Sequence, residues 1–212
     1  MDFHIHVTKA SQYQPWFLEW LGHIVPNPQE YLNRHLLDPH NLLGYLDSQG
    51  IHYAVCLAET NPICTGTIPN REVADFCKVS KRLIPFANIN PYTSNDLASE
   101  LQRAWEMGHR GLKLYPVYQH FYPNDPRLYP LYFKAQELQI PVMFHTGSSS
   151  FPGARIKYGD PIFLDDVAVD FPDLTIIMSH GGRGFWYEKA FFLTRLHKNI
   201  YMDITGLPPS KL

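Results

Sequence analysis

Histidines stand at the ends of short apolar runs in this sequence. His4 and His6 are two residues apart in the first such run. On a β-strand, residues two apart point to the same face, and a rise of ~3.3 Å per residue puts their Cβ atoms roughly 6–7 Å apart. Two imidazoles at that separation can reach one metal ion at about 2.1 Å each. The pair predicts metal binding, and exposed or hydrogen-bonded histidines are the alternative.

Two later apolar runs also end in histidine. His145 follows Met143 on one face of its predicted strand, and His180 is in phase with Ile176 and Met178 on the next. We expect His180 to repeat the placement of His145 one strand further along. A buried imidazole without a partner costs about 1–3 kcal/mol, which a metal or a hydrogen bond within the loop would offset. Three strands therefore deliver histidines to one edge of the predicted sheet.

Other polar residues lie near the same strand ends. Lys113 stands in mid-strand between two leucines, where an interior lysine needs an anion, a metal-bound partner or a lowered pKa. Pairing with a carboxylate near the mouth of the sheet is the alternative. Asp203 either orients a histidine or caps a loop. Tyr115 ends the Lys113 strand, and Arg155 lies in a Gly/Ser-rich loop, where it either holds a substrate carboxylate or stays in solvent.

The elements that must position these residues alternate between strands and helices. Helical patterns occupy 28–46 (broken near Pro39), 70–81, 95–107, 128–138, 161–171 and 184–196, and Pro208-Pro209-Ser210 looks like the start of another helix. Apolar runs bounded by Gly, Pro, Asn or Asp predict strands at Phe3–His6, Tyr53–Ala58, Leu83–Ile89, Gly111–Tyr115, Pro141–His145, Leu174–Ser179 and Ile200–Ile204.

Strands that alternate with helices predict an α/β protein with a parallel sheet. Seven strands, with an eighth required, indicate a (β/α)8 barrel that lacks its last β/α unit, over residues 1–212 as one domain. A doubly wound open sheet is the alternative. No Gly-x-Gly-x-x-Gly follows any strand, and the polar residues come from strands one, four, five and six, which favours the barrel.

Composition narrows the class of protein. The net charge of −2 and the absence of any Lys/Arg-rich run argue against nucleic-acid binding and against an anionic membrane as partner. Three cysteines without a disulfide-like spacing fit a reducing compartment, and the start of the chain is unlike a signal peptide. We expect a cytoplasmic protein with a small-molecule substrate. Trp16, Phe17 and Trp20 are typical of a lid or of a contact in a homo-oligomer.

The succession of motifs resembles the amidohydrolase superfamily, in particular its "amidohydrolase 2" branch of barrel enzymes. Gly-Leu-Lys-Leu-Tyr-Pro and Pro-Val-Met-Phe-His-Thr-Gly are the most specific stretches. The matching segments, in the order the family has them, are Asp2–His6, Gly108–Pro116, Pro141–Gly147, Phe171–Gly182 and Asn199–Gly206.

The resemblance implies that His4, His6 and His145 ligate one divalent metal, zinc first and manganese or iron as alternatives. It implies that His180 either ligates or acts as the base toward the metal-activated water, while a carbamate at Lys113 is not assumed. The family's catalytic aspartate ends strand eight, which lies beyond the last residue, Leu212. We therefore expect either a C-terminally truncated fragment or a missing strand supplied by another chain.

The resulting expectation is a metal-dependent hydrolase of a small carboxylic ester, lactone or amide, with Lys113, Tyr115 and Arg155 at the substrate and Asp203 behind a histidine. Non-oxidative decarboxylation of an aromatic or unsaturated acid is the first alternative, because the ligands alone do not separate the two reactions. An inactive metal-binding remnant is the second.

Overall fold

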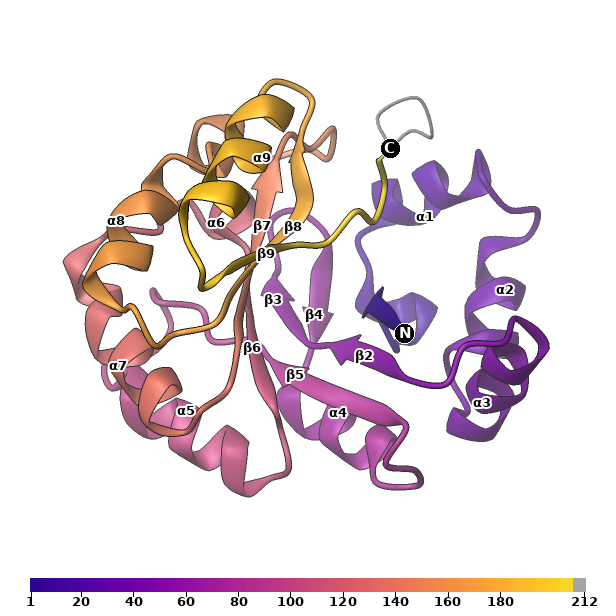
Figure 1. Cartoon of the computed structure of the whole chain (residues 1–212). Coiled ribbons are helices and arrows are strands. Elements are labelled where there is room, and N and C mark those ends of the chain that lie inside the picture. Colours follow the sequence, from indigo (N-terminus) through magenta and orange to yellow (C-terminus); the bar gives the residue numbers. More distant parts are fainter. Residues whose placement is uncertain (208–212) are drawn as a thin grey trace.

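Seven parallel strands form the centre of the molecule (Figure 1). The computed structural model describes residues 1–207, apart from the side chain of His35. The strands follow one another in the sheet as β1 (Asp2–Ile5), β2 (Ala54–Leu57), β5 (Leu83–Ala87), β6 (Gly111–Leu114), β7 (Val142–Gly147), β8 (Ile176–Arg183) and β9 (Ile200–Met202). The sheet curls as a (β/α)8 barrel does, with β1 and β9 at its two edges, which confirms the predicted fold class.

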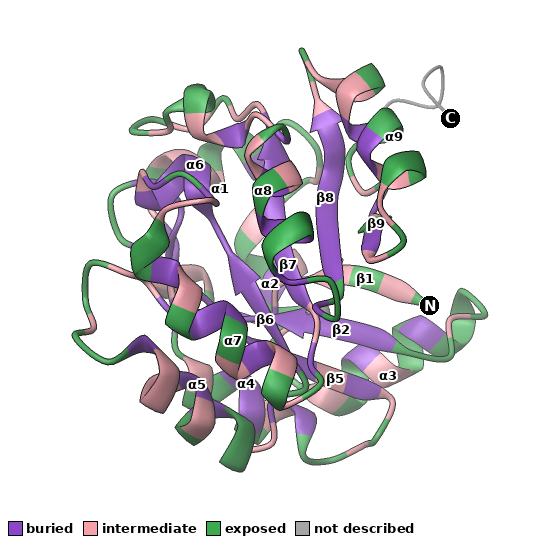
Figure 2. Cartoon of the chain, turned by 60° about the vertical axis from the view of Figure 1, so that its left-hand side comes forward, coloured by how far each residue is buried: buried purple, intermediate pink, exposed green. Residues whose placement is uncertain are grey.

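Helices connect the strands and cover the outer side of the sheet (Figures 1 and 2). Three lie between β1 and β2: α1 (Pro15–Gly22), α2 (Pro28–His35) and α3 (Pro39–Ser48). The others are α4 (Asn70–Cys77), α5 (Leu97–Glu106), the short α6 (Pro116–Gln119), α7 (Tyr129–Glu137), α8 (Phe163–Asp170) and α9 (Tyr187–Leu196). None of the helices within residues 1–207 is long and apolar enough to cross a membrane.

Local chemistry explains where these helices begin. The carboxylate of Asp96 accepts the backbone N–H of Ser99 and caps α5. The carboxylate of Asp38 accepts the N–H of His40, and Pro39 occupies the first turn of α3. The predicted break near Pro39 is therefore confirmed. The helix predicted from Pro208 lies outside the described residues.

The strands bury side chains on both faces. On the outer face, Val142, Phe144 and Ile176 join the large cluster beneath the helices. On the inner face, Met143 and Ile177 belong to a smaller cluster that fills the barrel interior. Because both faces are buried, the strands read as nearly continuous apolar runs, which is what made them recognisable in the sequence.

One connection interrupts the strand–helix alternation. After β2 the chain forms the antiparallel hairpin of β3 (Glu59–Asn61) and β4 (Gly66–Ile68) before α4 begins. No element was predicted for this segment from the sequence. The hairpin matters for function, because it carries Glu59 to the same end of the barrel as the histidines.

The strand phase was right for His145 and wrong for His180. His145 shares the inner face with Met143, as predicted, and pairs in register with Ser179. Ile176 and Met178 instead belong to the outer-face cluster, so a regular strand would turn His180 toward the helices. His180 has a φ of +64°, which redirects the chain within β8 and brings its ring to the inner rim.

Candidate active site

A pocket of about 600 Å³ opens where the barrel strands end. His4 from β1, His6 directly after it, His145 from β7 and His180 from β8 all line it. Their strands are parallel, so their carboxyl ends meet at one rim, which is the face that carries chemistry in barrels of this kind. The structure thus brings the four histidines predicted as site residues into one pocket.

The four imidazoles follow one another at nearly constant spacing. The ring centres of His6 and His4 are 5.3 Å apart, those of His4 and His180 4.7 Å, and those of His180 and His145 4.6 Å. Imidazoles that share one ion at about 2.1 Å bring their ring centres to roughly 4.5–5.2 Å from one another in tetrahedral or octahedral arrangements. Two of these neighbouring spacings fall within that range, and the spacing of His6 and His4 lies just above it.

Hydrogen bonds fix which edge of each ring is free. Nδ1 of His4 lies 3.0 Å from Oδ2 of Asp203, and Nδ1 of His180 lies 2.8 Å from the carbonyl oxygen of Thr205. A carboxylate or carbonyl can only accept, so each Nδ1 donates its hydrogen and each Nε2 keeps a lone pair. Asp203 follows β9 and therefore sits behind His4, the kind of position that was predicted for it as an orienting residue.

Two of the histidines hold buried atoms that lack hydrogen-bond partners among the described residues. They are Nε2 of His145 and Nδ1 of His6. Buried polar atoms are nearly always paired, since leaving one unpaired costs about 1–3 kcal/mol. His145 lines the pocket, and a further group bound at this rim would satisfy its orphaned Nε2.

The donor set fits a divalent metal ion. Burial lowers the pKa of His4, His145 and His180 well below the ordinary range, and burial with the nearby Lys113 lowers the pKa of His6 to about 3. Neutral imidazole is the form that binds metals. Within residues 1–207, however, no three His, Cys, Asp or Glu side chains already enclose a point as a metal site does, so the rings must turn to bind an ion.

Lys113 lies deeper than the pocket. Its side chain is fully buried, and Nζ donates a hydrogen bond of 2.6 Å to the hydroxyl of Ser179 on β8. Burial lowers the pKa of Lys113 to about 7, opposed by the charges of Asp203 and Glu59. The interior position predicted for this lysine is confirmed, but it does not line the pocket, so its substrate-binding role stays a prediction.

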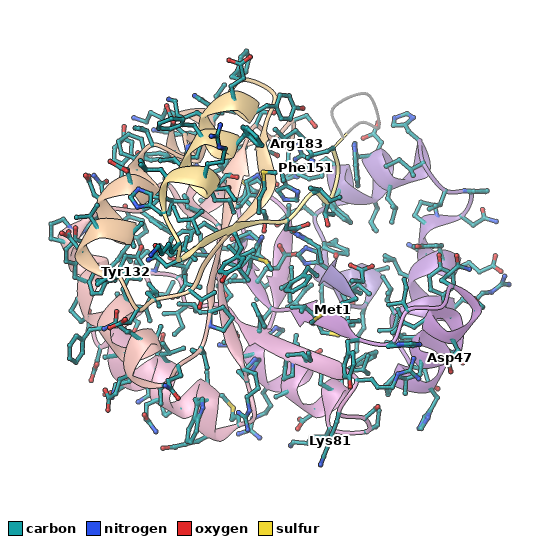
Figure 3. The ribbon with its side chains drawn as sticks, viewed as in Figure 1. Met1, Asp47, Lys81, Tyr132, Phe151 and Arg183 are labelled. Atoms are coloured by element: carbon teal, nitrogen blue, oxygen red, sulfur yellow. The ribbon has the colours of Figure 1, made fainter. Side chains whose placement is uncertain are left out.

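Aromatic side chains form the outer walls of the pocket. Phe17 and Trp20 of α1 meet Phe151 with ring centres 5.4 and 5.2 Å apart, and Tyr118 lies 4.9 Å from the ring of His145. Figure 3 shows Phe151 at the same end of the barrel as Arg183. Phe17 and Trp20 thus line the pocket and Trp16 does not, while a role of these residues as a lid or as a contact in a homo-oligomer stays a prediction.

The amidohydrolase family model matches residues 1–211, which is nearly the whole chain. The chain belongs to the amidohydrolase family. A search of curated proteins finds no match.

Several solved structures share the fold of this chain. An uncharacterized TIM-barrel protein of Bordetella bronchiseptica aligns with a TM-score of 0.77 and 23% identity over 96% of this chain and 74% of its own. A probable 2-pyrone-4,6-dicarboxylic acid hydrolase of Acinetobacter baumannii, with citric acid bound, gives 0.62 and 16% over 99% and 73%. A 5-carboxyvanillate decarboxylase of Novosphingobium aromaticivorans, complexed with manganese and a nitrobenzoic acid, gives 0.62 and 16% over 92% and 69%.

Of the two other predicted substrate contacts, the structure brings Tyr115 to the pocket and leaves Arg155 away from it. Tyr115 lines the pocket, and its hydroxyl donates to the carbonyl oxygen of Ala58 at 2.9 Å. Arg155 is exposed and does not line the pocket, because its loop folds back so that its backbone N–H reaches the carbonyl oxygen of Val117. The structure therefore does not bring Arg155 to the site.

Two other charged residues of the amidohydrolase site were missed. Arg183 ends β8, lines the pocket, and donates from a terminal guanidinium nitrogen to the carbonyl oxygen of Ser148 at 3.1 Å. Gly147 permits this close crossing: it has a φ of +91°, and a Cβ there would lie 2.3 Å from the backbone nitrogen of Arg183. Glu59 enters from the unpredicted hairpin. For Arg183, the signal in the sequence was the preceding Gly181-Gly182 pair, which allows the backbone to pass close to another group.

Proposed function

We propose that this amidohydrolase is a metal-dependent hydrolase of a small carboxylic ester, lactone or amide. The observation that carries the proposal is the group of four neutral imidazoles around one pocket, with an orphaned Nε2 on His145. His4, His6 and His145 would hold a divalent ion. Such an ion supplies Lewis acidity, which lowers the pKa of water so that hydroxide forms at neutral pH, and which polarises a substrate carbonyl.

His180 is the base in this proposal. Its Nδ1 donates to the carbonyl oxygen of Thr205, so Nε2 is free to take a proton from the attacking water. Burial lowers the pKa of His180 and keeps the ring neutral at pH 7. The proton accepted at Nε2 can then pass to the leaving group of the substrate.

Arg183 and the aromatic walls position the substrate. Arg183 is the cation that lines the pocket beside the four histidines, and a guanidinium binds carboxylates through two parallel hydrogen bonds. Phe17, Trp20 and Phe151 give the pocket an apolar surface. The site therefore suits a small substrate with one anionic end and one flat or apolar part.

The same features favour decarboxylation of an aromatic or unsaturated acid as a second candidate. Arg183 and the aromatic walls would hold the carboxylate and the ring of such an acid as well as those of an ester. The neighbours of similar fold include both a hydrolase and a decarboxylase by name.

An assay of the protein loaded with Zn²⁺, and separately with Mn²⁺, tests these candidates. We expect hydrolysis of lactones or esters in proportion to bound metal, and loss of activity with retained metal in His180→Ala. Release of carbon dioxide from hydroxybenzoates, with no hydrolysis of any ester, lactone or amide, would replace the hydrolase with the decarboxylase. Neither reaction, with less than ~0.2 equivalents of metal retained, would indicate the inactive remnant.

We place this enzyme in the cytoplasm and expect zinc as its resident metal, because imidazole ligands suit zinc and all three cysteines are free and buried. Metal analysis of the protein purified from its own cells checks the metal, and fractionation of those cells checks the compartment. Assembly into a homo-oligomer stays a proposal, which light scattering on a sizing column tests.

A further inference from the structure

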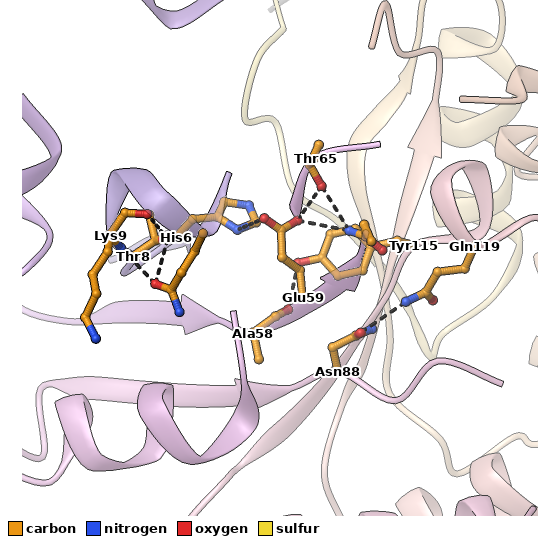
Figure 4. Close-up of polar contacts among 11 residues, drawn as sticks. His6, Thr8, Lys9, Ala58, Glu59, Thr65, Asn88, Tyr115 and Gln119 are labelled. Carbon is orange, nitrogen blue, oxygen red and sulfur yellow. Dashed lines mark hydrogen bonds and ion pairs between the residues drawn. The ribbon is translucent and has the colours of Figure 1, made fainter. Parts of the chain in front are cut away.

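Glu59 is a buried carboxyl that the reaction proposed above does not use. It begins β3, and its side chain is 2% exposed. One oxygen, Oε2, accepts hydrogen bonds from Nδ2 of Asn61 and from the hydroxyl of Thr65, both at 2.9 Å (Figure 4). The other oxygen, Oε1, has no hydrogen-bond partner among the described residues. The carboxyl is therefore anchored through one oxygen and unpaired at the other.

The unpaired oxygen faces His6. Oε1 lies 4.0 Å from Nδ1 of His6, the same nitrogen that is buried without a partner (Figure 4). An N–H that donates to a carboxylate lies about 2.7–2.9 Å from it, so the pair stands about an ångström short of a hydrogen bond. A small rotation of either side chain would close the gap and satisfy both orphaned atoms together.

The neighbouring histidine already shows the closed form of this arrangement. Oδ2 of Asp203 lies 3.0 Å from Nδ1 of His4, which turns the Nε2 edge of that ring away from the carboxylate. His180 does the same with the carbonyl oxygen of Thr205. His6 presents the matching edge only if its own Nδ1 also donates to a partner, and Glu59 is the carboxyl that faces it.

We propose that Glu59 is the positioning residue of His6. Its Oε1 accepts the hydrogen bond from Nδ1–H, fixes the tautomer and leaves the Nε2 lone pair for an ion. The inference rests on the metal centre of the proposed function. Histidines that bind metals usually donate their second N–H to a carboxylate or carbonyl, and removal of that acceptor typically weakens metal binding 10–100-fold.

Glu59→Gln is the sharpest variant, because the hairpin dictates how the amide must lie. Asn61 and Thr65 donate to the anchored oxygen, so the amide oxygen stays there and the NH₂ group turns toward His6. The NH₂ then donates to Nδ1, which moves the ring hydrogen to Nε2 and blocks the lone pair that an ion needs. Glu72→Gln, the same substitution at a half-exposed carboxylate on α4, is the matched control.

Nitrogen-15 NMR of labelled histidines in the metal-free protein reads the tautomer directly, with the His6 signal assigned by its loss in His6→Asn. We expect Nδ1–H in the wild-type protein and in Glu72→Gln, and Nε2–H in Glu59→Gln. Nε2–H on His6 of the wild type would overturn the proposal. This measurement on the wild type decides even if Glu59→Gln fails to fold, which circular dichroism reveals.

Zn²⁺ titration against a chelator provides the second readout. We expect binding about 10–100-fold weaker in Glu59→Gln than in the wild type and Glu72→Gln, with the same number of ions bound at saturation. Zn²⁺ binding in Glu59→Gln as tight as in the wild type would refute the positioning role of Glu59. A wild type that binds no ion would overturn the proposed function, while the tautomer would still decide on Glu59.

Discussion

Asp203 and Glu59 place carboxylates beside His4 and His6, but these carboxylates are held in different ways. Asp203 follows β9, and its second oxygen accepts the backbone N–H of Thr205 at 2.7 Å. Glu59 is anchored by the side chains of Asn61 and Thr65 in a hairpin outside the barrel sheet. The first pair is closed at 3.0 Å and the second stands open at 4.0 Å.

The difference indicates where this rim is preorganised. A carboxylate fixed by backbone at the end of a barrel strand already orients His4, whereas one fixed by side chains on a hairpin can still move toward His6. In the proposed metal centre, an ion would then close one half of the site more than the other. The exposed fractions agree, since the side chain of His4 is 7% exposed and that of His6 25%.

Removing both His4 and His6 should have the largest effect, because each carboxylate then loses the histidine that it faces. We expect His4→Ala/His6→Ala to lose bound metal and all activity together, measured by metal analysis after dialysis and by the hydrolase assay. His40→Ala/His52→Ala removes two exposed histidines and should retain both properties. Activity that survives in the first double variant would refute the assignment of the site.

Asp203→Asn should weaken Zn²⁺ binding more than Glu59→Gln does. The backbone N–H of Thr205 keeps the amide oxygen in place, so the NH₂ group faces Nδ1 of His4 and reverses its tautomer. Because this hydrogen bond is already formed, we expect a loss near the upper end of about 10–100-fold. Chelator competition measures both variants. An equal or larger loss in Glu59→Gln would show that the open pair is the more important one.

The contrast also shows how far sequence reasoning reaches. Strand ends can be predicted from the sequence. Apolar runs and their period-two phase predicted one rim for four residues, His4, His6, His145 and Asp203. Glu59 was missed because the hairpin at residues 59–68 is short and has no such alternation. His180 was placed correctly for the wrong reason, since its positive φ reverses the phase of the strand. Such reversals depend on tertiary packing rather than on local pattern.

Arg155 and Arg183 show the same limit for loops. The Gly/Ser-rich loop after β7 looked mobile and substrate-facing, yet its arginine lies exposed. The guanidinium that lines the pocket ends the next strand instead. Loop paths are set by contacts such as the one between Arg155 and Val117, which no spacing rule predicts.

The charges of Asp203 and Glu59 both act on the pKa of Lys113. This pKa predicts that the free energy of unfolding depends on pH. Burial lowers the pKa of Lys113 from 10.5 to about 7, opposed first by Asp203 and then by Glu59. Between these values the unfolded chain carries a proton that the folded chain lacks. The free energy of unfolding therefore rises with pH, by about 1.4 kcal/mol per pH unit from this group, and is independent of its titration below pH 7.

Lys113→Met should remove this rise. Urea denaturation of the metal-free protein, at several values between about pH 7 and pH 9, measures the free energy of unfolding of variant and wild type. Lys134→Met removes a surface lysine that pairs with Glu137 and should keep the wild-type slope. A slope that stays unchanged in Lys113→Met would mean that Lys113 is charged in the folded protein.

The smallest expected effect on Zn²⁺ affinity comes from loosening the anchor of Glu59, which is held by side chains, compared with that of Asp203, which is held by the backbone. Thr65→Val removes one of the two donors to Glu59, and we expect Zn²⁺ binding weaker by about two- to tenfold, the value of one hydrogen bond. Thr205→Val makes the same change beside Asp203 but keeps the backbone N–H that anchors it, so metal affinity should stay at the wild-type value. Chelator competition compares the two valine variants. A valine at position 65 can loosen Glu59 only if the Thr65 hydroxyl holds it, whereas Asp203 keeps its backbone donor in Thr205→Val. Equal affinities in the two variants would therefore mean that Thr65 does not set the position of Glu59.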